Sequence, residues 1–151
     1  MPQPTIHELN RAACEGILAR HSVGRLAFWQ QNRVDIEPLH YVYIDGWIYG
    51  RTSPGRKIEA VGHQHHVAFE VDEVRDVFDW RSVVVHGGWY LMESAPPAEL
   101  ARWERGVEAL RKLVPGSLTE NDPVPFRTVV FRIHAAEITG RECLPPRETE
   151  R

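Results

Sequence analysis

Residues 34–57, VDIEPLHYVYIDGWIYGRTSPGRK, contain the strongest fold signal in the chain. The central Asp45-Gly46 pair is typical of a two-residue β-hairpin turn, because both positions of that turn need a positive φ angle. The apolar and aromatic residues on either side predict antiparallel strands over 34–44 and 47–52. The second strand runs into a segment of glycines, hydroxyls and cations.

The rest of the chain extends this sheet and adds helices around it. Apolar or alternating runs predict further strands over 23–29, 67–74, 80–92 and 126–140. Helices are predicted over 5–20, 55–63 and 96–114. Because hairpins and short connections join most strands, and no regular run of crossover helices is present, the pattern predicts a six-stranded antiparallel barrel with peripheral helices.

Three local features sharpen these predictions. Thr5 and Glu8 have capping-box spacing, which places the start of the first helix at residue 5. The pair Gly87-Gly88 indicates a bulge or a close backbone approach within its strand. One face of the 96–114 helix is expected to pack on the barrel, and it carries Leu100, Trp103, Val107, Leu110 and Val114.

Composition limits the protein class. A chain of 151 residues is expected to form a single domain, 1–151, with a flexible tail over 141–151. Its net charge of -3 and scattered arginines argue against a nucleic-acid partner, and no apolar run is long enough for a membrane span. No secretory signal precedes the first helix, which predicts a cytoplasmic protein. Cys14 and Cys143 have the spacing of neither a zinc site nor a disulfide framework, and Cys14 is expected to pack in the helix.

The segment Gly50–Lys57 predicts a phosphate site without a magnesium nucleotide. A Walker loop needs lysine directly after its second glycine and then a hydroxyl, but Arg56 and Lys57 follow Gly55 here. The hydroxyls of Thr52 and Ser53, together with the nearby cations, suit one phosphate monoester. On the motif alone, a solvated turn is an equal alternative.

The ordered set of segments resembles the FMN-binding split β-barrel family related to pyridoxamine 5'-phosphate oxidase and the 5-nitroimidazole reductases. The likeness covers about residues 20–92 and includes the PLHY segment at 38–41, the Asp-Gly hairpin, the SPGRK loop at 53–57, AFEVDE at 68–73 and WRSV at 80–83. It implies a mainly β split barrel with Greek-key topology and flanking helices.

The resemblance also implies which residues bind the cofactor. The phosphate would be held by Thr52, Ser53, Arg56 and Lys57, with Arg51 as a helper. The isoalloxazine ring would lie along Pro38, Leu39, His40 and Tyr41, largely through main-chain groups, and Trp80 and Ser82 would approach it. The family implies a homodimer with FMN between the subunits.

The implied function is flavin-dependent oxidation or reduction of a small molecule, like that of a pyridoxamine 5'-phosphate oxidase or a nitroreductase. The segment RECLPPRETER, 141–151, differs from the substrate-binding tail of the oxidases, which argues against vitamin B6 oxidation. The alternatives are a flavin-binding or sensing protein without turnover, or the same barrel with the deazaflavin F420 or haem. No catalytic side chain is assigned, because a flavin itself carries the electrons.

Other candidate sites are weaker. His63, His65 and His66 could bind a metal, but His65 and His66 are neighbours entering a strand and should point to opposite faces. We therefore interpret this segment as a solvated connector and predict no metal site. His86 is interpreted as structural.

Overall fold

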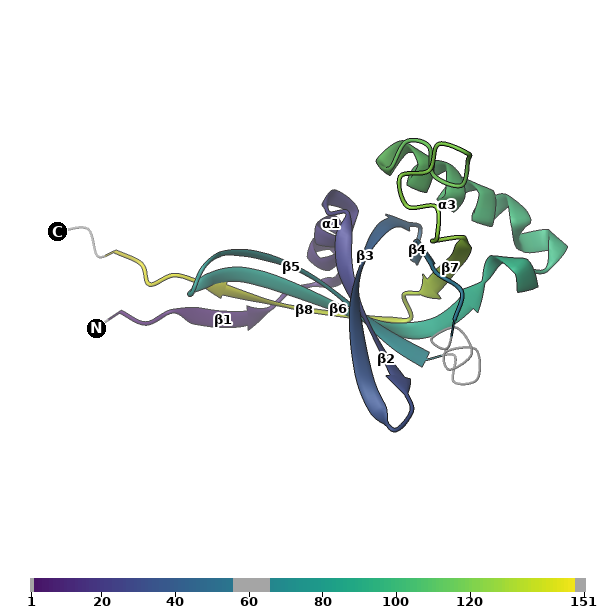
Figure 1. Cartoon of the computed structure of the whole chain (residues 1–151). Coiled ribbons are helices and arrows are strands. Elements are labelled where there is room, and N and C mark those ends of the chain that lie inside the picture. Colours follow the sequence, from purple (N-terminus) through teal and green to yellow (C-terminus); the bar gives the residue numbers. More distant parts are fainter. Residues whose placement is uncertain (1, 56–65, 149–151) are drawn as a thin grey trace.

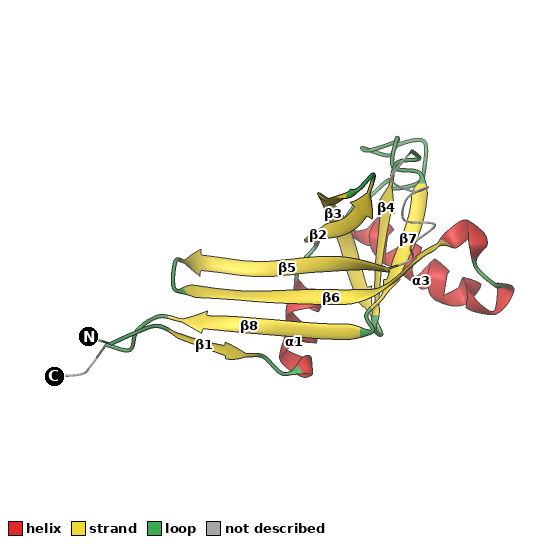
Figure 2. Ribbon diagram, turned by 90° about the horizontal axis from the view of Figure 1, so that it is seen from below, coloured by secondary structure: helices red, strands yellow, loops and turns green. Residues whose placement is uncertain are grey.

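The computed structural model describes residues 2–55 and 66–148, which form eight antiparallel strands and two α-helices (Figures 1 and 2). The strands are β1 (Thr5–Glu8), β2 (Val23–Gln30), β3 (Arg33–Ile44), β4 (Trp47–Thr52), β5 (His66–Asp76), β6 (Asp79–Leu91), β7 (Val129–His134) and β8 (Glu137–Leu144). The helices are α1 (Arg11–Arg20) and α3 (Leu100–Leu113), with short 3-10 helices η1 (Met92–Ser94) and η2 (Pro97–Glu99) before α3.

The strands form one sheet in the order β1-β8-β6-β5-β2-β3-β4-β7. The end of β6, Trp89–Leu91, also pairs with β7, and this pairing closes the sheet into a barrel. β1, β8 and the first part of β6 extend beyond the barrel with β5, and both chain ends lie at this extension (Figure 1). The predicted antiparallel β fold is confirmed, with two more strands in the described residues than the six expected.

The β3–β4 hairpin forms as its sequence predicts. Asp45 has a φ angle of 48° and Gly46 one of 84°, which matches the turn that an Asp-Gly pair favours. Gln31 and Asn32, with φ angles of 49° and 61°, make the equivalent turn between β2 and β3. Register across both hairpins is therefore fixed by local turn chemistry.

The predicted start of the first helix is wrong. Thr5–Glu8 is strand β1, which pairs with β8 from Thr5 opposite Leu144 to Glu8 opposite Arg141. The helix begins at Arg11 after Asn10, whose side-chain oxygen accepts a hydrogen bond from the Ala13 N–H at 2.8 Å. Asn10 therefore caps the helix in place of Thr5. Of the predicted flexible tail over 141–151, residues 141–144 lie in β8, and 145–148 have no helix or strand.

The last predicted strand, 126–140, is two strands. β7 ends at His134 and β8 begins at Glu137, and between them the Ala135 N–H donates to the Gly46 carbonyl oxygen at 2.9 Å. The chain crosses β6 closely here, since a Cβ atom on Gly87 would lie 1.6 Å from the His134 carbonyl oxygen. The β5–β6 register runs through Gly87 and Gly88 without interruption, so the close approach is confirmed and the bulge is not.

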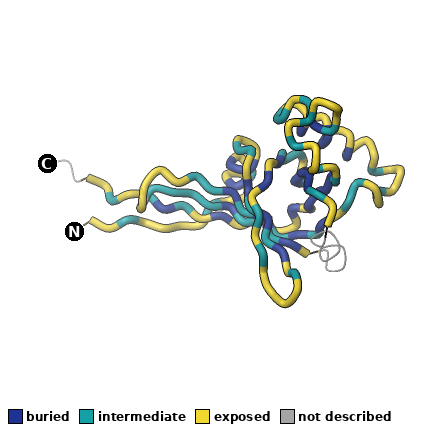
Figure 3. Tube along the Cα trace, viewed as in Figure 1, coloured by how far each residue is buried: buried dark blue, intermediate teal, exposed yellow. Residues whose placement is uncertain are grey.

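Two apolar cores support the barrel. α1 fills one end with Cys14, Ile17 and Leu18, as expected for Cys14, and α3 covers β4 and β7 with Trp103, Val107 and Leu110 (Figure 3 colours the chain by burial). The predicted face of α3 is wrong at Leu100, which is exposed. Within the described ranges, no helix is long and apolar enough to cross a membrane.

Candidate functional site

β3 and β4 separate at one point of the barrel, and predicted site residues lie on both sides of it. The β3–β4 ladder ends at the pair Tyr41–Gly50. Before that point β3 pairs with β2 alone, and after it β4 pairs with β7 alone, with Arg51 opposite Val130. On the side of Pro38–His40 that faces away from β2, the main-chain groups thus have no strand partner in the described residues. This separation is called the β3–β4 split below.

Thr52, the last residue of β4, has a buried hydroxyl without a partner. The residue is 1% exposed, and its Oγ1 atom makes no hydrogen bond within the described ranges. A buried unpaired hydroxyl destabilises a fold by about 1–3 kcal/mol. A group of this kind at the end of a strand is more consistent with ligand binding than with fold stability.

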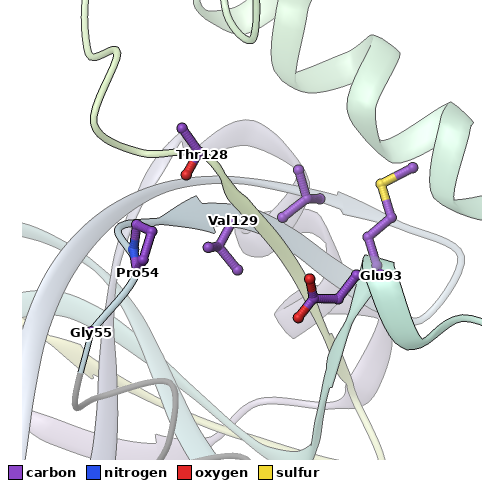
Figure 4. A pocket seen from close by; sticks show the side chains of 7 residues that line it. Pro54, Gly55, Glu93, Thr128 and Val129 are labelled. Carbon is purple, nitrogen blue, oxygen red and sulfur yellow. The ribbon is translucent and has the colours of Figure 1, made fainter.

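A cavity of about 680 Å³ opens directly after Thr52. Figure 4 shows its wall, in which Pro54 and Gly55 follow β4 and the Glu93 carboxylate lies across the opening. Ser53, the residue after the end of β4, is half-buried. Arg56 and Lys57, predicted to bind the phosphate, lie outside the described residues, as do His63 and His65.

Arg51, the residue before Thr52, is held by a buried ion pair. Its guanidinium donates through two nitrogens to the carboxylate of Asp122, and both side chains are buried. Asp122 also accepts from the Leu118 N–H at 2.7 Å and the Val124 N–H at 2.9 Å. The hydrogen bonds from Arg51 hold the Asp122 pKa well below its usual value. The pair fastens the loop after α3 to β4.

The predicted ring-binding residues alternate in direction along β3. Leu39 and Tyr41 point into the core, where the Tyr41 hydroxyl donates to the Leu18 carbonyl oxygen at 2.7 Å and burial raises the Tyr41 pKa. Pro38 and His40 are exposed on the other side of the strand. Only these two of the four side chains can meet a ligand on that side.

Pro38, His40, Trp80 and Ser82 lie on one face of the sheet. Pro38 is opposite Arg25 and Arg25 is opposite Glu70, while Asp72 is opposite Ser82. Directly paired residues share a face, and so do residues two apart in a strand. We call this surface of β2, β3, β5 and β6 the outer face, because α1 packs on the opposite side.

Hydrogen bonds connect the polar side chains of the outer face. The Ser82 hydroxyl donates to Glu70 at 3.0 Å, and Arg25 lies 3.4 Å from Glu70 and 3.6 Å from Asp72. Burial raises the Glu70 pKa, and the nearby Asp72 carboxylate raises it further. A cavity of about 610 Å³ adjoins this cluster and is lined by Trp80, Ser82 and His86, among others.

Large apolar side chains are exposed next to these polar groups. Val34 is 69% exposed and Ile36 64% exposed, and Trp29 pairs with Val34 on the same face. These residues belong to the β2–β3 hairpin, which protrudes from the barrel (Figure 1). Single exposed apolar residues are ordinary, but a contiguous set indicates a contact surface.

The sequence did not identify every residue of this region. Asp122 lies 71 residues from Arg51, and nothing in the local turn sequence marks it as a partner. Arg25 and Glu70 become neighbours only through the β2–β5 pairing. In the described part of the chain, no group of three or more histidine, cysteine, aspartate and glutamate side chains is arranged to hold a metal ion.

The chain is similar to several known proteins. An uncharacterized protein from Rhizobium meliloti is 25% identical over 145 residues, which cover 90% of this chain and 94% of that protein. The crystal structure of an FAD-binding protein from Mesorhizobium loti is 28% identical, covers 91% of this chain and 97% of its own, and has a TM-score of 0.73. An FAD-binding protein from Mycobacterium smegmatis shares the fold at 24% identity and a TM-score of 0.65. The match covers 91% of this chain and 98% of that protein. The family model described as pyridoxamine 5'-phosphate oxidase matches residues 10–142.

Proposed function

The chain belongs to the pyridoxamine 5'-phosphate oxidase family, and we propose from this premise that it binds FMN, with the phosphate at the end of β4 and the isoalloxazine ring at the β3–β4 split. The observation that carries the proposal is the buried Thr52 hydroxyl, which has no partner in the described residues. Thr52 pairs with Val129, which lines the cavity. The description of the Mesorhizobium loti protein as FAD-binding supports a flavin. FAD contains the same ring, ribityl chain and first phosphate as FMN.

The phosphate is assigned to the end of β4. The hydroxyls of Thr52 and Ser53 donate to it, and Arg56 and Lys57 supply positive charge. Arg51 is assigned a positioning role, since its guanidinium is engaged by Asp122. The Glu93 carboxylate across the cavity repels a dianion, so the phosphate is expected to lie at the Thr52 end.

The isoalloxazine ring is assigned to the split. The unpaired main-chain edge of Pro38–His40 offers hydrogen-bonding groups to the polar edge of the ring, while Leu39 and Tyr41 keep this part of β3 fixed through the core. Trp80 and Ser82 lie on β6, across β5 and β2 from β3, and are assigned to the ring held by a second copy of the chain. When bound, the flavin supplies the electron-transfer chemistry, and these residues bind it, orient it and exclude water.

A second copy of the chain is proposed to cover the outer face. A flavin on that face would otherwise be open to water, and the exposed side chains of Trp29, Val34 and Ile36 provide an apolar contact next to it. In a two-fold dimer the same patch contributes from both subunits. Each flavin then lies between subunits, and each subunit supplies Trp80 and Ser82 to the flavin held by the other.

The proposed activity is oxidation or reduction of a small molecule. The test is to mix the flavin-loaded protein with NADPH or NADH without oxygen, follow the flavin absorbance, and then add an acceptor panel that includes oxygen and a nitroimidazole. Rapid bleaching followed by reoxidation is expected. A flavin that stays oxidised with every donor would overturn the enzymatic part and leave a binding or sensing protein.

A further inference from the structure

Arg132 lies between two tryptophan rings in the second apolar core. Its guanidinium carbon is 3.7 Å from the centre of the Trp47 ring and 4.7 Å from that of Trp103. The residue sits in β7, opposite Tyr49 of β4 on one side and Tyr90 of β6 on the other. Stacking of this kind holds an arginine in place while leaving its N–H groups free to donate in the plane.

The hydrogen-bonding capacity of Arg132 is only partly used. One terminal nitrogen donates to the Glu99 carboxylate, which is itself one-third exposed. Arg132 is only 4% exposed, and its Nε and Nη1 atoms are buried without a partner in the described residues. A buried donor without an acceptor is unfavourable, and donors on a charged group are the most unfavourable.

One neighbouring tryptophan has the same deficit. The indole N–H group of Trp103 is buried and also lacks an acceptor in the described ranges. The Trp89 indole instead stacks on Phe131 in the first core, on the opposite face of the strands from Arg132. Trp89, Trp103 and Arg132 all line one cavity of about 280 Å³, together with Tyr90, Ser94 and Pro96. We call this cavity the Arg132 pocket. Three unpartnered donor nitrogens, two of Arg132 and one of Trp103, therefore belong to side chains that line a single space.

The chemistry of these side chains selects the ligand. Arginine and tryptophan only donate hydrogen bonds, so the ligand must bring acceptors. The ring surfaces favour a flat apolar body, and the volume corresponds to about nine water molecules at roughly 30 Å³ each. Glu99 offsets the Arg132 charge from the exposed side. Arg132 has the largest part in lowering the Glu99 pKa, and Arg102 lowers it further, so Glu99 has a second cation nearby. The local charge thus remains suitable for an anion.

We propose that the Arg132 pocket binds a small carboxylic acid with a flat apolar body, its carboxylate accepting hydrogen bonds from Arg132 and the indole of Trp103. This site is separate from the proposed flavin site, because none of the residues assigned to FMN lines it. It lies under α3, whereas the outer face belongs to β2, β3, β5 and β6. The proposal therefore stands or falls independently of flavin binding.

The test is calorimetric titration of the full-length protein, with whatever cofactor it carries, using three matched probes. Phenylacetate carries the carboxylate, 2-phenylethanol is its neutral analogue and phenethylamine is the cation. Phenylacetate should bind with a Kd of about 0.1–1 mM, the range for a ligand of roughly ten non-hydrogen atoms. The other two probes should bind at least tenfold more weakly.

Variants locate the binding to this pocket. Arg132→Met should weaken phenylacetate binding at least tenfold, and Trp103→Phe, which keeps a ring but removes the N–H, about threefold to tenfold. Arg105→Met is the matched control, because Arg105 pairs with Asp45 on the exposed side of α3 and does not line the pocket. Its affinity should equal that of the wild type. Circular dichroism checks that each variant is folded.

Three results would overturn the proposal. The first is no heat of binding with 10 mM phenylacetate, which would mean that the pocket holds only water. The second is equal affinity for phenylacetate and 2-phenylethanol. The third is unchanged affinity in Trp103→Phe, a variant that remains decisive even if Arg132→Met fails to fold.

Discussion

Replacing Thr52 by valine should affect the free protein and the flavin complex in opposite directions. Valine has almost the shape of threonine but lacks the hydroxyl, and the Thr52 hydroxyl is buried without a partner in the described residues. Removing an unpaired buried hydroxyl should therefore raise the free energy of unfolding of the cofactor-free protein, by as much as about 1–2 kcal/mol. If the hydroxyl donates to the flavin phosphate, the complex loses a hydrogen bond to a charged group worth about 1.5–3 kcal/mol. FMN affinity should then fall by about tenfold to a hundredfold.

Two measurements on the same preparations check this prediction. Urea unfolding of the cofactor-free protein gives the stability change, and fluorescence titration with FMN gives the affinity change. Thr5→Val is the control, since Thr5 is an exposed strand residue in β1 and neither quantity should change. Unchanged FMN affinity in Thr52→Val would refute the assignment of this hydroxyl to the phosphate. A loss of stability in the cofactor-free variant would show that the hydroxyl has a structural partner.

Three further predictions concern the phosphate loop, the dimer and the outer-face carboxylate. Arg56→Ala with Lys57→Ala should lower FMN affinity at least tenfold by calorimetry while the circular dichroism spectrum stays unchanged; equal affinity would remove both cations from the site. Ile36→Asp should convert a dimer to a monomer in light scattering and weaken FMN binding, whereas a dimer that persists would move the interface away from the outer face. Glu70→Gln should match the wild type in stability below the usual glutamate pKa of 4.5 and exceed it at neutral pH. The Glu70 pKa is raised in the folded wild type, so the wild type loses stability as the pH rises from the usual glutamate pKa through the raised one. Urea unfolding at both pH values measures this, and identical pH dependence would contradict the raised pKa.

Local turn chemistry made the centre of the fold predictable. The Asp45-Gly46 turn fixes the register of β3 against β4, so the predicted strand over 47–52 has the same bounds as β4. The start of the first helix was not predictable in this way. Thr5 and Glu8 satisfy a capping pattern, but pairing with β8, more than 130 residues later, makes a strand of this segment. A long-range ladder overrides a local helix signal here.

The candidate site was predictable in its parts but not in its arrangement. The hydroxyls at the end of β4 stand out in the sequence, whereas the engagement of Arg51 by Asp122 depends on a loop 71 residues away. Alternation along β3 separates Pro38 and His40 from their neighbours, but which side is the core depends on where α1 packs. The Arg132 pocket has no sequence signal, because Trp89, Trp103 and Arg132 come from three different elements.

The identity and amount of the cofactor test the central claim most directly. The full-length protein should be purified without added cofactor, and its absorption spectrum and the mass of any released small molecule recorded, before and after incubation with FMN, FAD, F420 and haem. One FMN per chain, held through gel filtration, is expected. A protein that retains F420 or haem instead would contradict the FMN assignment, and one that retains none of the four would contradict the proposed site as a whole.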